Sequence, residues 1–320
     1  MSERTVRERI GLDISRRPAR EAMRTIQEHE AAGVATAWST QGAVGIDALT
    51  VFAAAAAQTS SIVLATGIVP AFTRHPLALA GQALAFEEIA PGRLRLGVGT
   101  SHQRSVGAAY GIPMERSLAR LREYLQVLVP TLQTGAVSFH GEFYDAEATL
   151  PATKTPVLIS ALREKAWELG GELSDGAISW NVPMPFLNDV ARPAMERGAA
   201  TAGRSCPPLI GHVIVGFSGS GRSEAQVRET ARETLGLYGL NPYYANMFAD
   251  SGHPLEGGVG GRVTDGLVDA LAFITNDDGA VADHLRQLLA GGLDEALVMI
   301  VPGPDDRADE ARLARIVGRM

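Results

Sequence analysis

Short apolar runs alternate with longer helical patterns along the whole 320-residue chain. This alternation constrains the fold most, because strands that are separated by helices run parallel in one sheet. Eight such runs indicate strands, at residues 10–14, 34–39, 61–67, 94–98, 156–160, 176–179, 209–217 and 295–301. Eight strand–helix units predict closure into a (β/α)8 TIM barrel.

A doubly wound open sheet is the main alternative for an alternating chain. That fold usually has fewer units and carries a glycine-rich turn directly after its first strand. Here Ile14 is followed by Ser-Arg-Arg-Pro, without glycine, which favours the barrel. Helices are expected at residues 18–32, 47–58, 76–89, 116–133, 164–173, 186–202, 223–237, 281–290 and 309–317.

Two segments interrupt the alternation and predict insertions after strands four and seven. Residues 137–145 suggest a hairpin with Gly141 in its turn. Residues 238–264 are rich in glycine, proline and aromatic residues, and long loops of a barrel are commonly lids or pocket walls. Its aromatic stretch, 242–248, suggests either a cover for a hydrophobic substrate or a packed helix. We expect one domain over residues 1–320.

Composition and charge exclude several classes of function. The net charge of −7 argues against a nucleic-acid partner, which would need a basic face. The single cysteine, Cys206, excludes an internal disulfide and a cysteine-based metal cluster, and no metal is expected. The N-terminal segment is charged and does not resemble a signal peptide, and apolar runs such as 51–57 are too short to cross a membrane. A cytoplasmic protein without membrane partners is expected.

Glycines follow two of the expected strands at their carboxyl ends, where barrel enzymes hold their chemistry. Strand three ends in Ala-Thr-Gly-Ile-Val at 65–69, and strand four ends in Gly-Val-Gly-Thr-Ser-His at 97–102. Without a Cβ, such glycines allow close approach of a flat ligand. They are equally compatible with simple turn formation.

The order and spacing of two stretches resemble a known family. Residues 65–102 read ATGIVPAFTRHPLALAGQALAFEEIAPGRLRLGVGTSH, and residues 156–178 read PVLISALREKAWELGGELSDGAI. Both are similar to the luciferase-like monooxygenase superfamily and, within it, to the branch that depends on coenzyme F420. The resemblance runs over most of the chain and is weakest at 186–261.

The resemblance implies a cofactor site at three loops. A non-prolyl cis peptide after strand three would support the ring, the loop after strand four would contact its edge and side chain, and the loop after strand five would hold a phosphodiester at a helix N-terminus. The corresponding residues are Gly67, Ile68, Thr100, Ser101, His102, Ser160, Ala161, Leu162 and Arg163. The expected cis bond is Gly67–Ile68.

The same resemblance suggests catalytic and substrate residues. His102 stands where sugar-phosphate dehydrogenases of this branch hold an acidic residue for proton transfer, and histidine can do that work near neutral pH; positioning a ligand is the alternative. Those dehydrogenases also end strand two with an Asp-His pair, whereas residues 39–42 here read Ser-Thr-Gln-Gly, so that substrate is doubtful. The candidate substrate contacts are Trp38, Gln41, Arg74 and Trp180.

The predicted function is hydride transfer between coenzyme F420, a deazaflavin, and an unidentified small organic substrate. The alternatives are a luciferase-like monooxygenase that uses FMN and a non-catalytic flavin-binding barrel. The helices at 47–58 and 76–89 are apolar almost all round, which favours a homodimer interface. Alternatively, their alanines are simply good helix formers on a surface.

Overall fold

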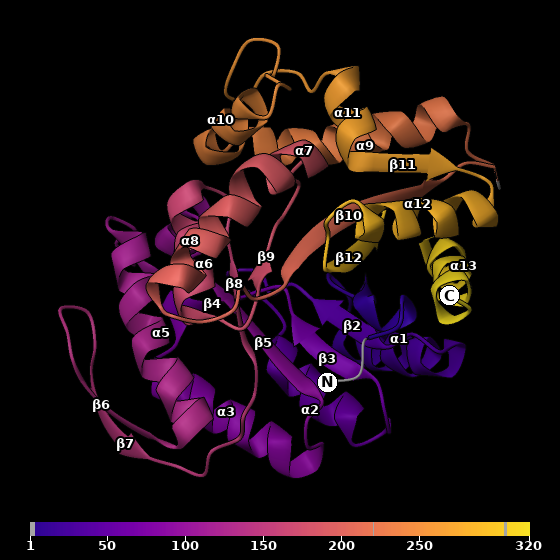
Figure 1. The fold of residues 1–320 in the computed structure, drawn as a ribbon. Helices are drawn as coiled ribbons and strands as arrows, with labels where there is room; N and C mark the ends of the chain where they lie inside the picture. The colour runs from indigo at the N-terminus through magenta and orange to yellow at the C-terminus, as the bar shows by residue number, and fades with distance from the viewer. Residues whose placement is uncertain (1–3, 220, 304–305) are drawn as a thin grey trace.

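A computed structural model describes residues 4–219, 221–303 and 306–320 of the chain (Figure 1). Residues 1–3, 220, 304 and 305 lie outside the described residues. In the described part, eight parallel strands form a closed ring and confirm the predicted barrel. They are β1 (Ile10–Asp13), β2 (Thr36–Ser39), β3 (Val63–Thr66), β5 (Leu94–Gly99), β8 (Val157–Ser160), β9 (Ala177–Ile178), β10 (Leu209–Phe217) and β12 (Glu295–Ile300).

Helices surround this ring and cover its outer face (Figure 1). The main ones are α1 (Ala19–Ala32), α2 (Ala48–Ala56), α3 (Pro76–Ile89), α5 (Ser117–Thr134), α6 (Glu164–Leu173), α8 (Arg192–Thr201), α9 (Glu224–Gly239), α12 (Asp278–Ala290) and α13 (Asp306–Gly318). Local sequence sets their ends. Ser223 and Gln226 form a capping box at the start of α9, and Asp47 caps α2 by accepting from the Thr50 amide.

Short elements join the strands to the helices. They are the 3-10 turns η1 (Arg7–Arg9) and η2 (Ala71–Thr73), the π-helical turns η3 (Gln103–Gly107) and η4 (Leu187–Ala191), the strand β4 (Val69–Pro70), and the helices α4 (Ala108–Tyr110) and α7 (Met184–Phe186). β4 pairs with β5 directly after the end of β3, so the chain leaves β3 along its neighbour.

Two further segments extend the barrel. The hairpin of β6 (Ala136–His140) and β7 (Asp145–Thr149) lies between α5 and β8 and projects beside α5 (Figure 1). Between β10 and α12 the chain forms α9, α10 (Pro242–Asp250), α11 (Asp265–Leu271) and β11 (Ala272–Thr275). β11 pairs with β10 outside the closed ring. Sequence analysis missed β11 because its four residues follow a helix without a turn.

The interior of the barrel holds a compact apolar cluster of its own. We call it the inner cluster, and its members are Trp38, Ala65, Ile68, Leu158, Ile178, Ile210 and Leu297. Trp38 is 1% exposed, and the indole lies so close to Gly11 that a Cβ there would be 2.3 Å from Nε1. The barrel is therefore filled by side chains at this level, as in other closed barrels of eight strands.

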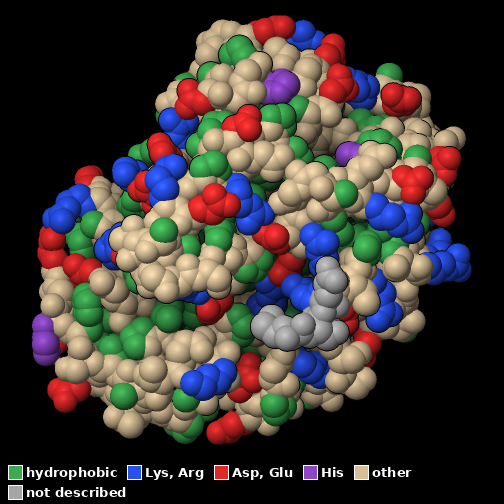
Figure 2. Space-filling view, in the orientation of Figure 1, with side chains coloured by type: hydrophobic (Ala, Val, Ile, Leu, Met, Phe, Trp, Pro, Cys, Tyr) green, Lys and Arg blue, Asp and Glu red, His purple; other side chains and the backbone are tan. Residues whose placement is uncertain are grey.

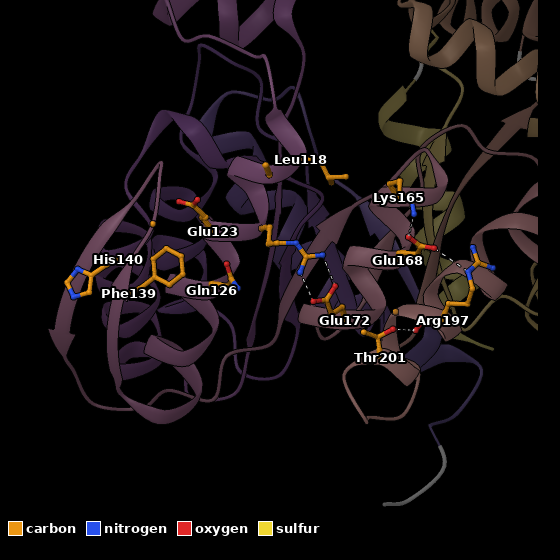
Figure 3. A pocket seen from close by; sticks show the side chains of 14 residues that line it. Leu118, Glu123, Gln126, Phe139, His140, Lys165, Glu168, Glu172, Arg197 and Thr201 are labelled. Carbon is orange, nitrogen blue, oxygen red and sulfur yellow. Dashed lines mark hydrogen bonds and ion pairs between the residues drawn. The ribbon is translucent and has the colours of Figure 1, made fainter.

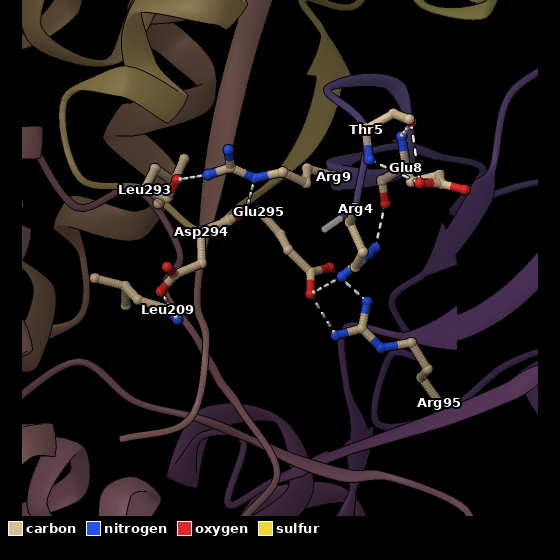
Figure 4. Close-up of polar contacts among 9 residues, drawn as sticks. All are labelled: Arg4, Thr5, Glu8, Arg9, Arg95, Leu209, Leu293, Asp294 and Glu295. Atoms are coloured by element: carbon tan, nitrogen blue, oxygen red, sulfur yellow. Dashed lines mark hydrogen bonds and ion pairs between the residues drawn. The ribbon is translucent and has the colours of Figure 1, made fainter. Parts of the chain in front are cut away.

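An ion pair closes the amino-terminal end of the barrel below the inner cluster (Figure 4). The carboxylate of Glu295, at the start of β12, accepts from both terminal nitrogens of Arg95 on β5, at 2.5 and 3.0 Å. Arg4 donates to the same carboxylate at 2.5 Å, and the Arg95 guanidinium lies 5.3 Å from the ring centre of Trp38. Burial raises the pKa of Glu295, but the two guanidinium groups outweigh it and hold the pKa below its usual value.

We expect Glu295→Gln to lower the free energy of unfolding by about 3 kcal/mol, because it leaves the charge of Arg95 in the barrel without a counter-charge. Urea denaturation followed by circular dichroism measures this. Glu142→Gln is the matched control, since its pair with Arg116 is exposed on both sides and should contribute less than about 1 kcal/mol.

The loss of unfolding free energy in Glu295→Gln should depend on pH. Because the pKa of Glu295 is lower in the folded protein than in the unfolded chain, its stabilisation is present above the ordinary pKa and disappears as the pH falls through the lowered value. The difference between wild type and Glu295→Gln should therefore shrink in acid. Equal losses for the two variants at neutral pH would contradict this role.

Candidate active site at the carboxyl end of the barrel

The turn after β3 is held from β2. Its Gly67–Ile68 peptide bond is cis, as predicted. The hydroxyl of Thr40 donates to the carbonyl oxygen of Gly67 at 2.8 Å, and the amide of Gln41 donates to the carbonyl oxygen of Ile68 at 3.0 Å. The amide of Thr40 in turn donates to the hydroxyl of Ser15 at 2.7 Å. The segment after β2, which lacks the Asp-His pair, thus positions the turn after β3.

Close packing of β5 against its neighbouring strands requires two of its glycines, a reason that sequence analysis did not identify. A Cβ on Gly97 would lie 2.0 Å from the carbonyl oxygen of Thr66, and one on Gly99 would lie 2.1 Å from the hydroxyl oxygen of Ser160. Both glycines therefore allow β5 to approach its two neighbours, whatever binds above them. Neither turn formation nor ligand approach is needed to explain them.

The loop after β5 contacts the insertion after β10. Ser101 adopts a left-handed conformation with φ of 56°, and the chain continues into η3. The Nδ1 atom of His102 is 3.0 Å from the side-chain nitrogen of Asn241, the N-cap of α10, and the Tyr244 ring packs edge-on at 5.9 Å. Partial burial against α10 lowers the pKa of His102, which favours the neutral ring.

The aromatic stretch at 242–248 forms α10 and packs as an ordinary helix. Tyr244, Met247 and Phe248 are buried, whereas Tyr243 is 68% exposed. The sequence suggested either a cover for a hydrophobic substrate or a packed helix, and the structure shows the packed helix. Its first turn contacts His102, so α10 borders the candidate site.

The loop after β8 leads directly into α6. The Ala161 amide donates to the carbonyl oxygen of Ile178 at 3.0 Å, which fixes the start of the loop. α6 begins at Glu164 without a side-chain cap, so its first amide groups are open to an anion. The Arg163 side chain turns to α10 and forms an ion pair with Asp250 at 2.6 Å.

The predicted substrate residues lie in different surroundings. Trp38 belongs to the inner cluster and does not reach the surface. Arg74 forms an ion pair with Asp47 at 2.8 Å and donates to the side-chain oxygen of Gln41 at 3.4 Å, beside the turn after β3. Trp180 follows β9 and packs against the inner cluster.

Sequence analysis missed further polar groups at this end of the barrel. The Asp13 carboxylate, at the end of β1, accepts from the hydroxyl and the amide of Ser15, and burial raises its pKa above the usual value. His212 lies inside β10 beneath Trp180. An acidic residue that ends an apolar strand was a usable signal for Asp13. His212 had none, because β10 is buried along its whole length.

A surface groove of about 860 Å³ lies elsewhere, between α5, α6, α8 and the β6–β7 hairpin (Figure 3). Its charged groups pair with one another: Arg122 with Glu172 at 2.5 Å, and Lys165 with Glu168 at 2.8 Å. Among the described residues, none from the eight barrel strands lines it. We therefore place the candidate site at the barrel end and not in this groove.

The surface charge and the side-chain types of the described residues bear on which partners the protein could bind. On the face shown in Figure 2, basic and acidic side chains are interspersed. Within the described ranges, no group of three or more histidine, cysteine, aspartate or glutamate residues is arranged to hold a metal ion. No helix in the same ranges has the length and apolarity needed to span a membrane.

Comparison with known proteins identifies the family. A family model described as luciferase-like monooxygenase matches residues 5–295. The chain belongs to this family. As a luciferase-like protein it is similar to the 5,10-methylenetetrahydromethanopterin reductase of Methanolobus tindarius, with 27% identity over 91% of this chain and 92% of that protein. It is also similar to the F420-dependent glucose-6-phosphate dehydrogenase of Nakamurella multipartita, with 33% identity over 54% of this chain and 53% of that one.

Solved structures share the luciferase-like fold. An F420-dependent secondary alcohol dehydrogenase in complex with an F420-acetone adduct aligns with a TM-score of 0.77, at 15% identity, over 96% of this chain and 97% of the other. At this identity the likeness concerns the fold.

We expect Gly97→Ala to lower the free energy of unfolding by about 3 kcal/mol, because the added Cβ meets a backbone carbonyl that no side-chain rotation can move. Gly236→Ala in α9 is the control. A Cβ there has nothing within 4 Å, and alanine should raise stability by about 0.5–1 kcal/mol. Both are measured by urea denaturation, and a neutral Gly97→Ala would refute the close-packing explanation.

Proposed function

We propose that this luciferase-like protein is an F420-dependent oxidoreductase that transfers a hydride between the deazaflavin and a small organic substrate. One observation carries the proposal. The three loops with the expected cofactor residues follow β3, β5 and β8, which are consecutive neighbours in the barrel. They therefore form one continuous rim segment, on which the ring and the phosphodiester of an extended cofactor would lie in the order β3, β5, β8.

The residues of this rim are chemically suited to hold coenzyme F420. The Ile68 side chain points into the barrel and joins the inner cluster, which gives a flat ring an apolar support. The loop after β5 carries two hydroxyl groups: that of Thr100 donates to the Ser101 carbonyl oxygen, and that of Ser101 lies 3.2 Å from the Ser105 hydroxyl. The uncapped start of α6 offers amide hydrogens to a phosphodiester. When bound there, the deazaflavin supplies the hydride chemistry.

The chain would take up the proton that the substrate loses together with its hydride. We assign proton transfer to His102, because it stands at the rim in its neutral form and neutral imidazole accepts a proton. Its contact with Asn241 fixes the ring orientation. We assign substrate contacts to Gln41 and Arg74, which are hydrogen-bonded to each other, and to Trp180, which packs on the inner cluster. Trp38 acts from below, through its packing in the inner cluster.

The test is a titration of the purified protein with coenzyme F420 and, separately, with FMN, followed by quenching of tryptophan fluorescence. We expect F420 to bind at least tenfold more tightly than FMN. Tight binding of FMN alone would support the luciferase-like monooxygenase alternative. Binding of neither would refute a cofactor site on this rim.

Repeating the F420 titration with Thr40→Val and Thr40→Ser tests the role of the Thr40 hydroxyl. Valine removes the hydroxyl that donates to the Gly67 carbonyl, and serine keeps it. If the turn after β3 supports the ring, F420 affinity should fall about fivefold to tenfold with valine and remain near wild type with serine. A urea denaturation curve for each variant separates this effect from a general loss of stability.

We also propose that the protein forms a homodimer through α2 and α3. Small or apolar side chains remain exposed on these two packed helices, at Ala54, Ala57, Ala78, Gly81 and Ala85. Helices with such surfaces pack closely against a second copy.

Light scattering coupled to gel filtration tests the dimer. Wild type should show twice the mass of the chain, and Ala54→Arg should shift it to the monomer by placing an unpaired charge in the interface. Ala200→Arg, at an exposed alanine of α8, should leave the dimer intact. A monomeric wild type would contradict the proposal.

A further inference from the structure

His212 is a buried histidine, and neither of its ring nitrogens has a hydrogen-bond partner within the part of the chain that the structure describes. It lies on β10, two residues after Ile210 of the inner cluster, so its side chain also faces the barrel interior. It is 5% exposed. Buried polar atoms in native proteins are almost always paired, so these two nitrogens indicate a partner that binds from outside the chain.

Trp180 covers this ring. The indole stacks on the imidazole with centroids 3.9 Å apart and an angle of 16° between the planes. The indole N–H itself is directed to the hydroxyl of Tyr238. Trp180 comes two residues after Ile178, another member of the inner cluster. The two rings thus form one aromatic wall, at the level directly above the inner cluster, and among the described residues both ring nitrogens of His212 are unpaired.

The wall is uncharged at neutral pH. Burial, with a smaller effect of Arg16, lowers the pKa of His212 to about 3. A neutral imidazole offers one N–H donor and one acceptor nitrogen. Arg16 and Asp13 carry opposite charges after β1; burial raises the pKa of Asp13, and the hydrogen bonds from Ser15, then Arg17 and Arg16, lower it by less. These groups favour a ligand without net charge.

Topology places this wall opposite the turn after β3. Counting along the closed ring in either direction, β10 is four strands away from β3. Ile68, a member of the inner cluster, lies on one side of the barrel. Trp180, which packs against the cluster, lies on the other, and the remaining members lie below and between them. A ring held against β3 therefore exposes its other face to Trp180 and His212.

We propose that Trp180 and His212 form the substrate wall of the site: His212 hydrogen-bonds the carbonyl or hydroxyl oxygen of an uncharged substrate that packs beside the edges of the two stacked rings. The position of this wall relative to the cofactor rests on the proposed function. Its chemistry rests on the unpaired nitrogens alone. His212 then determines specificity by selecting for the oxygen and against a bare hydrocarbon or an anion.

Three probe ligands of similar size test the wall. They are acetophenone, which has the carbonyl, ethylbenzene, which lacks it, and benzoate, which carries a charge. Their affinities are measured by saturation-transfer NMR, with and without saturating F420. We expect acetophenone to bind about tenfold more tightly than ethylbenzene, the difference that one buried hydrogen bond provides, and benzoate to bind more weakly than acetophenone.

His212→Phe is the informative variant, because it keeps a flat ring under Trp180 and removes both nitrogens. The preference for acetophenone over ethylbenzene should disappear in it and remain largely intact in His212→Asn. F420 affinity should stay within about threefold of wild type. His284→Phe is the matched control, since His284 stacks on Phe273 at 4.1 Å and 6° but lies on α12.

Several outcomes would overturn the proposal. These are no binding of acetophenone, a preference for benzoate, or an acetophenone preference that survives in His212→Phe. A parallel loss of F420 binding in His212→Phe would assign the wall to the cofactor. If wild type does not bind F420 at all, the proposed function fails, while the probe series without cofactor still decides the role of His212.

Discussion

Closure of the barrel depends on one very short strand. β9 has two residues, yet Ala177 and Ile178 pair with β8 on one side and with β10 on the other. This pairing joins the first half of the chain to the second and brings eight carboxyl ends onto one rim. His102 and Asn241 are 139 residues apart in sequence and meet only because the ring is closed. The proposed site is a product of this closure.

Sequence analysis recovered the barrel because its signal is repeated along the chain. It also located the turn after β3, through the resemblance of residues 65–102 to the luciferase-like family. It could not assign the interior of β10. A strand buried on both faces has no alternation of polar and apolar residues to show which side chains point inward. His212 was therefore invisible as a candidate, although Ile210 and His212 face the same way.

The glycines of β5 show a second limit of sequence reasoning. Their pattern marked the right place, but its physical cause lies in other strands. Gly97 is required by a carbonyl of β3, and Gly99 by a hydroxyl of β8. Likewise, Thr40 carried no chemical signal beyond the absence of the Asp-His pair. Its role appears only where β2 and β3 lie side by side, with its hydroxyl on the Gly67 carbonyl.

α10 is fastened to the barrel at both of its ends. Its N-cap, Asn241, contacts His102 in the loop after β5, and its last residue, Asp250, pairs with Arg163 in the loop after β8. Nine helical residues span about 14 Å, so the length of the helix sets the distance between its contacts with two neighbouring loops of the rim. An insertion or deletion inside α10 would break this spacing. The segment after β10 can therefore diverge in sequence during evolution more freely than it can change in length.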